Sequence, residues 1–432
     1  MGTDEYALLM TQTISPPASG SAELLTRAKQ VMPGGVMATY AMPDEVACVI
    51  DHGVGSQVYD AEGNEYIDYI LGSGPIIVGH CHPHVVEALE QQVRRGTQFY
   101  TLTQPVIELS EMLVDAIPCA DQVKLVSSGA EATFQALRVA RAATGRDKVL
   151  KFKGAYHGHH DYSLNDSGMK TAGIPGVIGG SLITATYNDA ESAHELIDRH
   201  ADELAAVIVE PVQRNTSPRP GFLRALREAT AAQGVILIFD EMVTGFRLAW
   251  GGGQELYEVV PDLATFGKAI GGGLPVAAVA GGSDLMRHLD PRQAADEGYV
   301  YCSGTLNGNP LGATAGVATL QVLGEPGVFE RWVDTAERLR VGLRGATEAI
   351  DYPVQVVGEG AMVGVLFADG DPLDPATPGR SDAARRKRVE TELIKRGILV
   401  NLPAKFYISI AHTEAQVDAT VEAFGEALAA AA

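Results

Sequence analysis

The stretch from residue 235 to 273 constrains the fold of this chain more than any other. It opens with the uninterrupted apolar run Val235–Phe239, which is typical of a strand covered on both faces in a parallel sheet. The run ends on Asp240 and Glu241, at the end of the strand where open α/β sheets bind their ligands. Lys268 follows in a glycine-rich turn. A carboxylate at a buried strand end and a lysine in a glycine-rich turn indicate two possible chemistries.

The first chemistry is nucleotide hydrolysis, because an apolar strand that ends in Asp-Glu resembles a Walker B strand. That function needs a phosphate loop of the form G-x-x-x-x-G-K-[ST]. Gly267-Lys268 is the only Gly-Lys pair in the sequence, and Ala269 follows it, so nucleotide hydrolysis is disfavoured. The second chemistry is that of pyridoxal 5′-phosphate, in which a lysine forms a Schiff base and an aspartate keeps the ring nitrogen protonated.

Pyridoxal phosphate also requires a phosphate cradle and a group that stacks on the ring. The cradle is predicted at residues 127–130, Ser-Ser-Gly-Ala, where a strand turns into a helix. The free N–H groups and the helix dipole face an anion at such a turn. Ser303-Gly304-Thr305 is a second candidate cradle, and Tyr156 in the segment KGAYHGH is the candidate stacking group.

Composition and charge exclude several classes of function. The 432 residues carry a net charge of −21, which argues against nucleic acid and anionic membrane surfaces as partners. The four cysteines form no C-x-x-C pair, so we expect neither a zinc site nor a disulfide framework. The histidine clusters 80–84 and 157–160 lack carboxylates or cysteines at ligand spacing, so no metal is expected. Without a secretory signal or a membrane-spanning run, the expected location is the cytoplasm.

The order of predicted elements indicates a domain organisation. Residues 1–20 are expected to form a flexible leader, and residues 21–70 the N-terminal part of a small domain. Strands and helices then alternate through residues 71–325, which is the βαβ pattern of a large domain with a parallel sheet. Residues 326–432 are expected to complete the smaller α+β domain, and their last helix begins with a capping box at Thr413.

The chain resembles a known family in several motifs at once. KFKGAYHGHHD, VIVEPVQRN, ILIFDEMVTGFR, DLATFGKAIGGGLP and SGTLNGNPL occur in the order and spacing of class III (ω-type) pyridoxal phosphate aminotransferases. Within that family the resemblance is strongest to the glutamate-1-semialdehyde 2,1-aminomutases, and it covers nearly the whole chain after the leader. It implies an α/β protein of fold type I, the PLP-dependent transferase fold, with a large domain built on a mostly parallel sheet and a smaller α+β domain.

The resemblance also implies roles for individual residues around the cofactor ring. Lys268 would form the Schiff base and, once released, carry a proton between the substrate Cα and the cofactor. Asp240 would pair with the pyridinium nitrogen. Tyr156 would stack on one face of the ring, and Met242 would pack on the other. Asn215 matches the position that binds the phenolic oxygen.

Other matching residues would hold the cofactor phosphate. Ser128, Gly129 and Ala130 would bind it from one subunit. Thr305 would reach it from the partner subunit, so the resemblance implies a homodimer whose active site is shared across the interface. Glu210 would support the site from behind the residues that touch the cofactor.

The chain departs from the family pattern mainly where a substrate would bind. Ala130 lacks the hydroxyl of the usual threonine, and Arg214 replaces a glycine. Residues 38–41, Ala-Thr-Tyr-Ala, replace the aminomutase Ser-Pro-Val-Arg, and residues 72–75 lack its tryptophan. The aminomutase Gln-Phe-Glu-Ala segment is missing at residues 405–406, Lys-Phe, which run directly into YISIAH. The machinery for the cofactor is therefore retained, whereas the machinery for the substrate differs.

These observations favour an aminotransferase that transfers an amino group between an amino acid or amine and an oxo acid or aldehyde by a ping-pong mechanism. The alternative is a pyridoxal phosphate isomerase, either the aminomutase or an amino-acid racemase. A non-catalytic cofactor-binding protein is disfavoured by the intact Lys268 and Asp240. Lys405, then Arg214 and Tyr40, are the candidate substrate residues, and we expect poor conversion of glutamate-1-semialdehyde.

Overall fold

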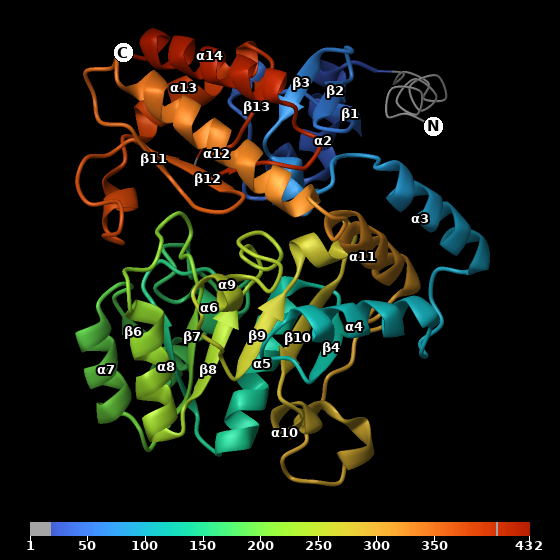
Figure 1. Ribbon diagram of the computed structural model, residues 1–432, viewed down its shortest axis with the longest axis vertical. Coiled ribbons are helices and arrows are strands. Elements are labelled where there is room, and N and C mark those ends of the chain that lie inside the picture. Colours follow the sequence, from blue (N-terminus) through green and yellow to red (C-terminus); the bar gives the residue numbers. More distant parts are fainter. Residues whose placement is uncertain (1–18, 403–404) are drawn as a thin grey trace. The chain divides into compact units, whose positions relative to one another are not determined.

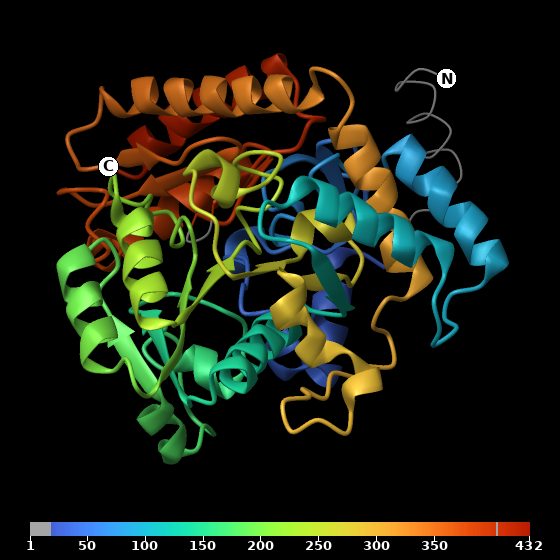
Figure 2. The same cartoon turned by 60° about the horizontal axis from the view of Figure 1, so that its bottom comes forward.

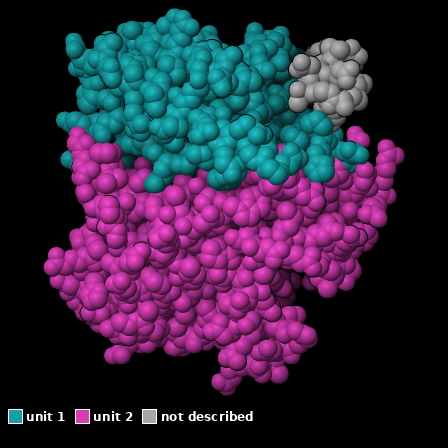
Figure 3. Space-filling view, in the orientation of Figure 1, with its two compact units in different colours: residues 1–87, 325–369, 378–432 teal, residues 88–324, 370–377 magenta. Residues whose placement is uncertain are grey.

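The computed structural model describes residues 19–402 and 405–432, and the chain forms two compact units (Figure 3). Unit 1 comprises Met1–Glu87, Glu325–Asp369 and Pro378–Ala432, and unit 2 comprises Ala88–Gly324 and Gly370–Thr377. The expected leader lies almost entirely outside the described residues. The domain limits expected near residues 70 and 325 stay predictions.

Unit 2 is built on a seven-stranded sheet, counted over the described residues, with the order β4-β10-β9-β8-β7-β5-β6 (Figure 1). Its neighbouring strands run parallel except at β10, which is antiparallel to both β4 and β9. The expected α/β fold with a mostly parallel sheet is thereby confirmed. The strands are β4 (Gln122–Val126), β5 (Lys148–Phe152), β6 (Leu182–Ala185), β7 (Leu204–Val209), β8 (Ile236–Asp240), β9 (Leu263–Phe266) and β10 (Ala277–Gly281).

Helices cover the sheet of unit 2 because its central strands are apolar on both faces. Every residue of β7 and of β9 is buried. Helix α5 packs across β4 and β7–β10, where its small buried residues, among them Ala132 and Ala136, allow close approach. Helix α8 packs on β8 and against α7 (Figure 2). The helices of this unit include α4 (Gln104–Ala116), α5 (Gly129–Thr144), α6 (Asp161–Leu164), α7 (Ala190–Arg199), α8 (Phe222–Gln233), α9 (Gly253–Leu256), α10 (Ser283–Met286) and α11 (Pro310–Leu323).

Two segments of unit 2 that the sequence singled out form defined structures. Helix α5 begins at Gly129, within the predicted cradle at residues 127–130, because Ser128 and Glu131 form a capping box. The glycine-rich turn around Lys268 is ordered as the 3₁₀ helix η5 (Lys268–Gly271).

The described residues of unit 1 form two small sheets, with the strand orders β1-β2-β3-β13 and β11-β12-β14. Helices α12 and α14 pack against each other, and the predicted capping box at Thr413 starts α14. No helix among the described residues is long and apolar enough to cross a membrane. The elements of unit 1 include β1 (Ile50–Val54), β2 (Gln57–Asp60), β3 (Glu65–Asp68), β11 (Gln355–Val357), β12 (Met362–Leu366), β13 (Ile398–Leu399), β14 (Phe406–Tyr407), α2 (Ser21–Val31), α12 (Val328–Thr347), α13 (Ala383–Lys395) and α14 (Glu414–Ala430), while α3 (Pro83–Arg95) crosses the unit limit.

Candidate active site

The carboxylate of Asp240 lies at the end of β8 and is held by three groups. Its Oδ1 accepts hydrogen bonds from the Met242 N–H at 3.1 Å and from the Thr265 hydroxyl at 3.3 Å. Its Oδ2 lies 2.7 Å from the His157 Nδ1. Asp240 is only 3% exposed, and a carboxylate this deeply buried is stable only when it is paired. The orientation of Asp240 is therefore fixed before any ligand binds.

His157 is a site residue that the sequence analysis considered only as a possible metal ligand. Its backbone N–H donates to the Ser163 hydroxyl at 2.9 Å, and its carbonyl accepts from the Thr133 hydroxyl at 2.5 Å. Those contacts fix the ring against Asp240, while its buried Nε2 has no hydrogen-bond partner among the described residues. Within residues 19–402 and 405–432, no cluster of three or more His, Cys, Asp or Glu could hold a metal ion. The motif position beside Tyr156 was the only sequence signal for this role.

Lys268 directly follows β9 and Gly267 and has a backbone φ of +46°, a left-handed conformation that is rare for a residue with a side chain. Such conformations persist where the surroundings enforce them, often at active sites. Burial lowers the pKa of the Lys268 amine, the nearby Asp240 opposes that shift, and the guanidinium groups of Arg247 and Arg214 reinforce it. The neutral amine, which is the nucleophilic form, is therefore available at a lower pH than in a free lysine.

Met242 links the lysine turn to the beginning of α5. A Cβ atom placed on Gly129 or on Gly267 would lie 2.7 Å from the Met242 sulfur in either case. The thioether therefore packs against the backbone of both turns, and each turn needs glycine for this close approach. Met242 thus brings together two segments that the sequence analysis had placed at one site.

The N-terminus of α5 has the geometry of an anion-binding turn. The Ser128 side chain caps the helix, and the Glu131 carboxylate accepts the N–H groups of Ser127 and Ser128 at 2.9 and 3.0 Å. The N–H groups of Gly129 and Ala130 belong to the first turn, where an α-helix offers them no intrahelical acceptor. Those two donors and the positive end of the helix dipole fit a phosphate group.

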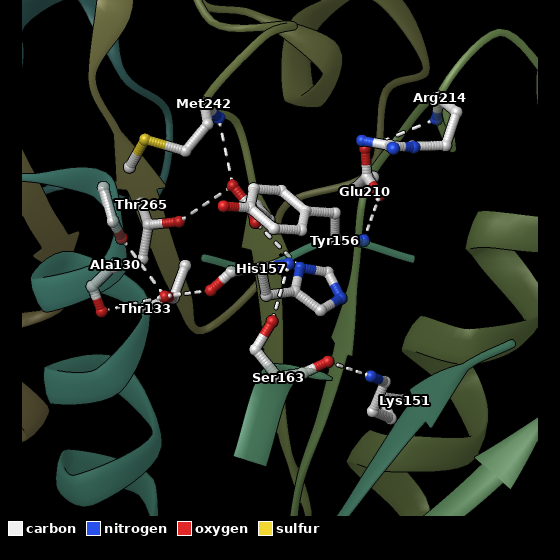
Figure 4. Close-up of polar contacts among 12 residues, drawn as sticks. Ala130, Thr133, Lys151, Tyr156, His157, Ser163, Glu210, Arg214, Met242 and Thr265 are labelled. Atoms are coloured by element: carbon white, nitrogen blue, oxygen red, sulfur yellow. Dashed lines mark hydrogen bonds and ion pairs between the residues drawn. The ribbon is translucent and has the colours of Figure 1, made fainter. Parts of the chain in front are cut away.

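Tyr156, Glu210 and Arg214 form the other side of the site (Figure 4). The two carboxylate oxygens of Glu210 accept the N–H of Tyr156 at 3.0 Å and the N–H of Arg214 at 3.3 Å. The Arg214 guanidinium carbon lies 5.6 Å from the centre of the Tyr156 ring. The Tyr156 ring is partly exposed and is fixed at its backbone, as a stacking group must be.

Together these groups fit pyridoxal phosphate. A buried, oriented carboxylate suits a protonated ring nitrogen, a lysine with a lowered pKa suits an aldehyde, and the start of α5 suits a phosphate. The residues that would hold the cofactor are Asp240, Lys268, Tyr156, Gly129 and Ala130.

The contacts described above do not include the remaining predicted site residues. Asn215 follows Arg214 and is partly buried, and Thr305 is exposed. In unit 1 the Tyr40 hydroxyl donates to the Glu390 carboxylate at 2.8 Å, and Lys405 is 7% exposed. The substrate roles of Tyr40 and Lys405 and the cofactor roles of Asn215 and Thr305 stay predictions.

Comparisons with known proteins agree with this description. Residues 39–428 match the family described as aminotransferase class-III. The chain is 44% identical over 424 residues to a glutamate-1-semialdehyde 2,1-aminomutase of Desulforudis audaxviator, covering 94% of this chain and 97% of that relative.

Solved structures share the whole fold. An omega-transaminase from Sphaerobacter thermophilus matches with a TM-score of 0.90 and 33% identity, covering 96% of this chain and 98% of that chain. A structure described as a transaminase with PLP bound matches with a TM-score of 0.87 and 32% identity, covering 95% of this chain and 97% of that chain. The resemblance found in the sequence motifs is confirmed by these matches.

Proposed function

The chain belongs to the class-III aminotransferases, and on that premise we propose that it moves an amino group between two carbons of one substrate, as a glutamate-1-semialdehyde 2,1-aminomutase does. It is an enzyme of the pyridoxal phosphate-dependent transaminase type. The single structural observation that supports amino-group chemistry is the Asp240 carboxylate, buried and oriented by His157, within electrostatic range of a Lys268 amine whose pKa is lowered.

The names of the most similar curated relatives that were compared support the aminomutase reaction. The chain is 44% identical to one named glutamate-1-semialdehyde 2,1-aminomutase, over nearly its full length. This reaction was the alternative in the sequence analysis, and the relatives favour it over the two-substrate transaminase that the motifs alone suggested.

A two-substrate aminotransferase is the second candidate, and a specific observation favours it. Residues 38–41, 72–75 and 405–406 depart from the aminomutase pattern at substrate positions. Moreover, two of the structures that match over most of the chain are described as transaminases.

The chemistry that the side chains perform is common to both candidates. Pyridoxal phosphate supplies an electron sink for the substrate carbon when it is bound. The Asp240 carboxylate would hold a proton on the ring nitrogen, and its hydrogen bonds from Thr265 and Met242 keep it aimed. The Lys268 amine would carry a proton to and from the substrate carbon that bears the amino group. Tyr156 would cover one face of the ring and exclude water from it.

We also propose a homodimer in which Thr305 contributes to the site of the partner subunit, and a cytoplasmic location. Thr305 is exposed in the single chain. The family resemblance and an exposed apolar surface, which runs over Tyr100, Leu102 and Leu306, support the dimer.

One experiment separates the two candidate reactions. The holoenzyme is incubated with glutamate-1-semialdehyde alone, and formation of its 5-amino-4-oxo isomer, which has the same mass, is followed by NMR spectroscopy. An aminomutase converts it without a second substrate. If only pairs of an amine and an oxo acid react, the two-substrate candidate is correct. If neither reacts while Lys268→Ala behaves like the parent protein, both candidates are wrong.

A further inference from the structure

Arg214 sits in a tight turn that directs its side chain to the active site. The Thr216 N–H donates to the Gln213 carbonyl at 2.8 Å and closes the turn. Arg214 occupies the left-handed position of this turn, with φ at +58°. Glycine is the residue that adopts this conformation without strain. Here a long cationic side chain occupies the position, which is a pattern associated with function.

Two contacts tie this turn to the segment that carries Tyr156. The Gln213 amide nitrogen donates to the Lys153 carbonyl at 2.8 Å. The Glu210 carboxylate bridges the N–H groups of Tyr156 and Arg214. Because the backbones on both sides are fixed by the same partners, the positions of Arg214 and the Tyr156 ring are coupled.

The Arg214 guanidinium therefore lies in the candidate active site and not on a remote part of the surface. Figure 4 shows its side chain directed toward Glu210 and the Tyr156 ring, and its guanidinium carbon lies 5.6 Å from the ring centre. Its charge acts on the Lys268 amine. The side chain is also exposed, so a ligand beside the ring can reach it.

We propose that Arg214 is a specificity-determining residue that binds a carboxylate of the substrate, so that the enzyme selects acidic amino or oxo compounds over uncharged amines. The guanidinium presents planar, paired donors that match a carboxylate. This inference rests on the proposed function, because only that function makes the bound carboxylate compound a substrate. It assigns the carboxylate to unit 2 and does not require Lys405.

The test uses an inert pair of probes. Glutarate has two carboxylates but no amino or oxo group, and glutaramide is its uncharged counterpart. Binding of each to the holoenzyme is measured by calorimetry for the parent enzyme and for Arg214→Gly. Glycine is the appropriate substitution because it adopts the left-handed turn without strain. We expect the dissociation constant for glutarate to rise by about ten- to a hundredfold, with that for glutaramide unchanged.

Matched variants define the controls. Arg214→Lys keeps the charge without the paired donors and should recover part of the affinity for glutarate. Arg224→Ala removes an exposed arginine of α8 and should have no effect. Cofactor retention after dialysis should be the same in all variants.

Three results would overturn the inference. The first is an equal loss of affinity for glutarate and for glutaramide in Arg214→Gly. The second is a loss of bound cofactor from Arg214→Gly that parallels its loss of glutarate affinity. The third is glutarate binding that is the same in the parent and the variant, or undetectable in both. Failure of the proposed function looks different. In that case glutarate binding would still depend on Arg214, but the parent enzyme would move no amino group in any substrate.

Discussion

At the scale of single residues, the sequence predicts which groups gather but not how they are oriented. Asp240 and Lys268 were recognised from a strand end and a glycine-rich turn. The bond from His157 to Asp240 joins residues 83 positions apart and depends on how β8 and the loop after β5 pack. The left-handed backbone of Lys268 likewise depends on tertiary contacts. No local pattern specifies either feature, because both are imposed by neighbours distant in sequence.

The lowered pKa of Lys268 predicts how the apoenzyme captures pyridoxal phosphate. Only the unprotonated amine attacks an aldehyde, so the rate of covalent capture should fall as the pH drops through the Lys268 pKa. The positive charge of Arg214 lowers that pKa. Removing the charge in Arg214→Gly should raise it, so the acid limb of the rate profile should move to higher pH.

Stopped-flow absorbance of apoenzyme mixed with cofactor across the pH range measures this profile. Arg224→Ala serves as the control, because it removes an arginine that does not figure among the charges acting on Lys268. An acid limb that stays in place in Arg214→Gly, or moves to lower pH, would show that the Arg214 charge does not act on Lys268.

At the scale of secondary structure, periodicity and capping predicted most of the helices and strands. The alternation of apolar strands with amphipathic helices gave the parallel sheet, and the Thr413 capping box marked the start of α14. Strand β10, with the sequence Ala-Ala-Val-Ala-Gly, was not anticipated. Its small residues have little strand propensity, and its antiparallel place between β4 and β9 comes from packing in the sheet.

Gly316 lies where α11 contacts η5, so we expect its substitution to reduce stability and slow cofactor capture. A Cβ on Gly316 would lie 2.2 Å from the Ile270 carbonyl oxygen, within the turn that begins at Lys268. Gly316→Ala should therefore push η5 away, lower the free energy of unfolding by about 1–3 kcal/mol and slow cofactor capture. Urea denaturation measures the stability, and capture is followed by absorbance.

Gly345 in α12 is the matched control, because a Cβ there meets no atom within 4 Å. Gly345→Ala should raise the free energy of unfolding by about 0.5–1 kcal/mol, since alanine restricts the unfolded chain and favours the helix. If both substitutions stabilise the protein equally, the close approach of α11 to η5 does not constrain Lys268.

At the scale of the whole molecule, we propose that two copies of the chain form a dimer. Leu102 and Leu306 are exposed apolar side chains, and the Tyr100 and Ser303 hydroxyls lie 3.2 Å apart, so two exposed segments near Thr305 in sequence or in contact are available to a partner. Assembly could be anticipated only through the family resemblance, because no sequence pattern encodes which surface covers another copy.

Hybrid subunits test the shared site. Thr305→Val should weaken retention of the cofactor phosphate, and Lys268→Ala should be inactive. A mixed dimer of the two variants contains one site with an intact Lys268 and an intact Thr305 from the other subunit. Activity should therefore return after the variants are mixed and reassembled. Continued inactivity of a verified hybrid dimer would mean that Thr305 serves its own subunit or has no role.

Chemical reduction of the holoenzyme identifies the lysine that carries the cofactor. The holoenzyme is reduced with borohydride and digested, and the modified peptide is identified by mass spectrometry. We predict a single pyridoxyl group on Lys268, and no such modification in Lys268→Ala. Burial lowers the pKa of Lys151 to about 8, which makes it a second reactive candidate. Modification of Lys151 in place of Lys268, or of no lysine at all, would contradict this account.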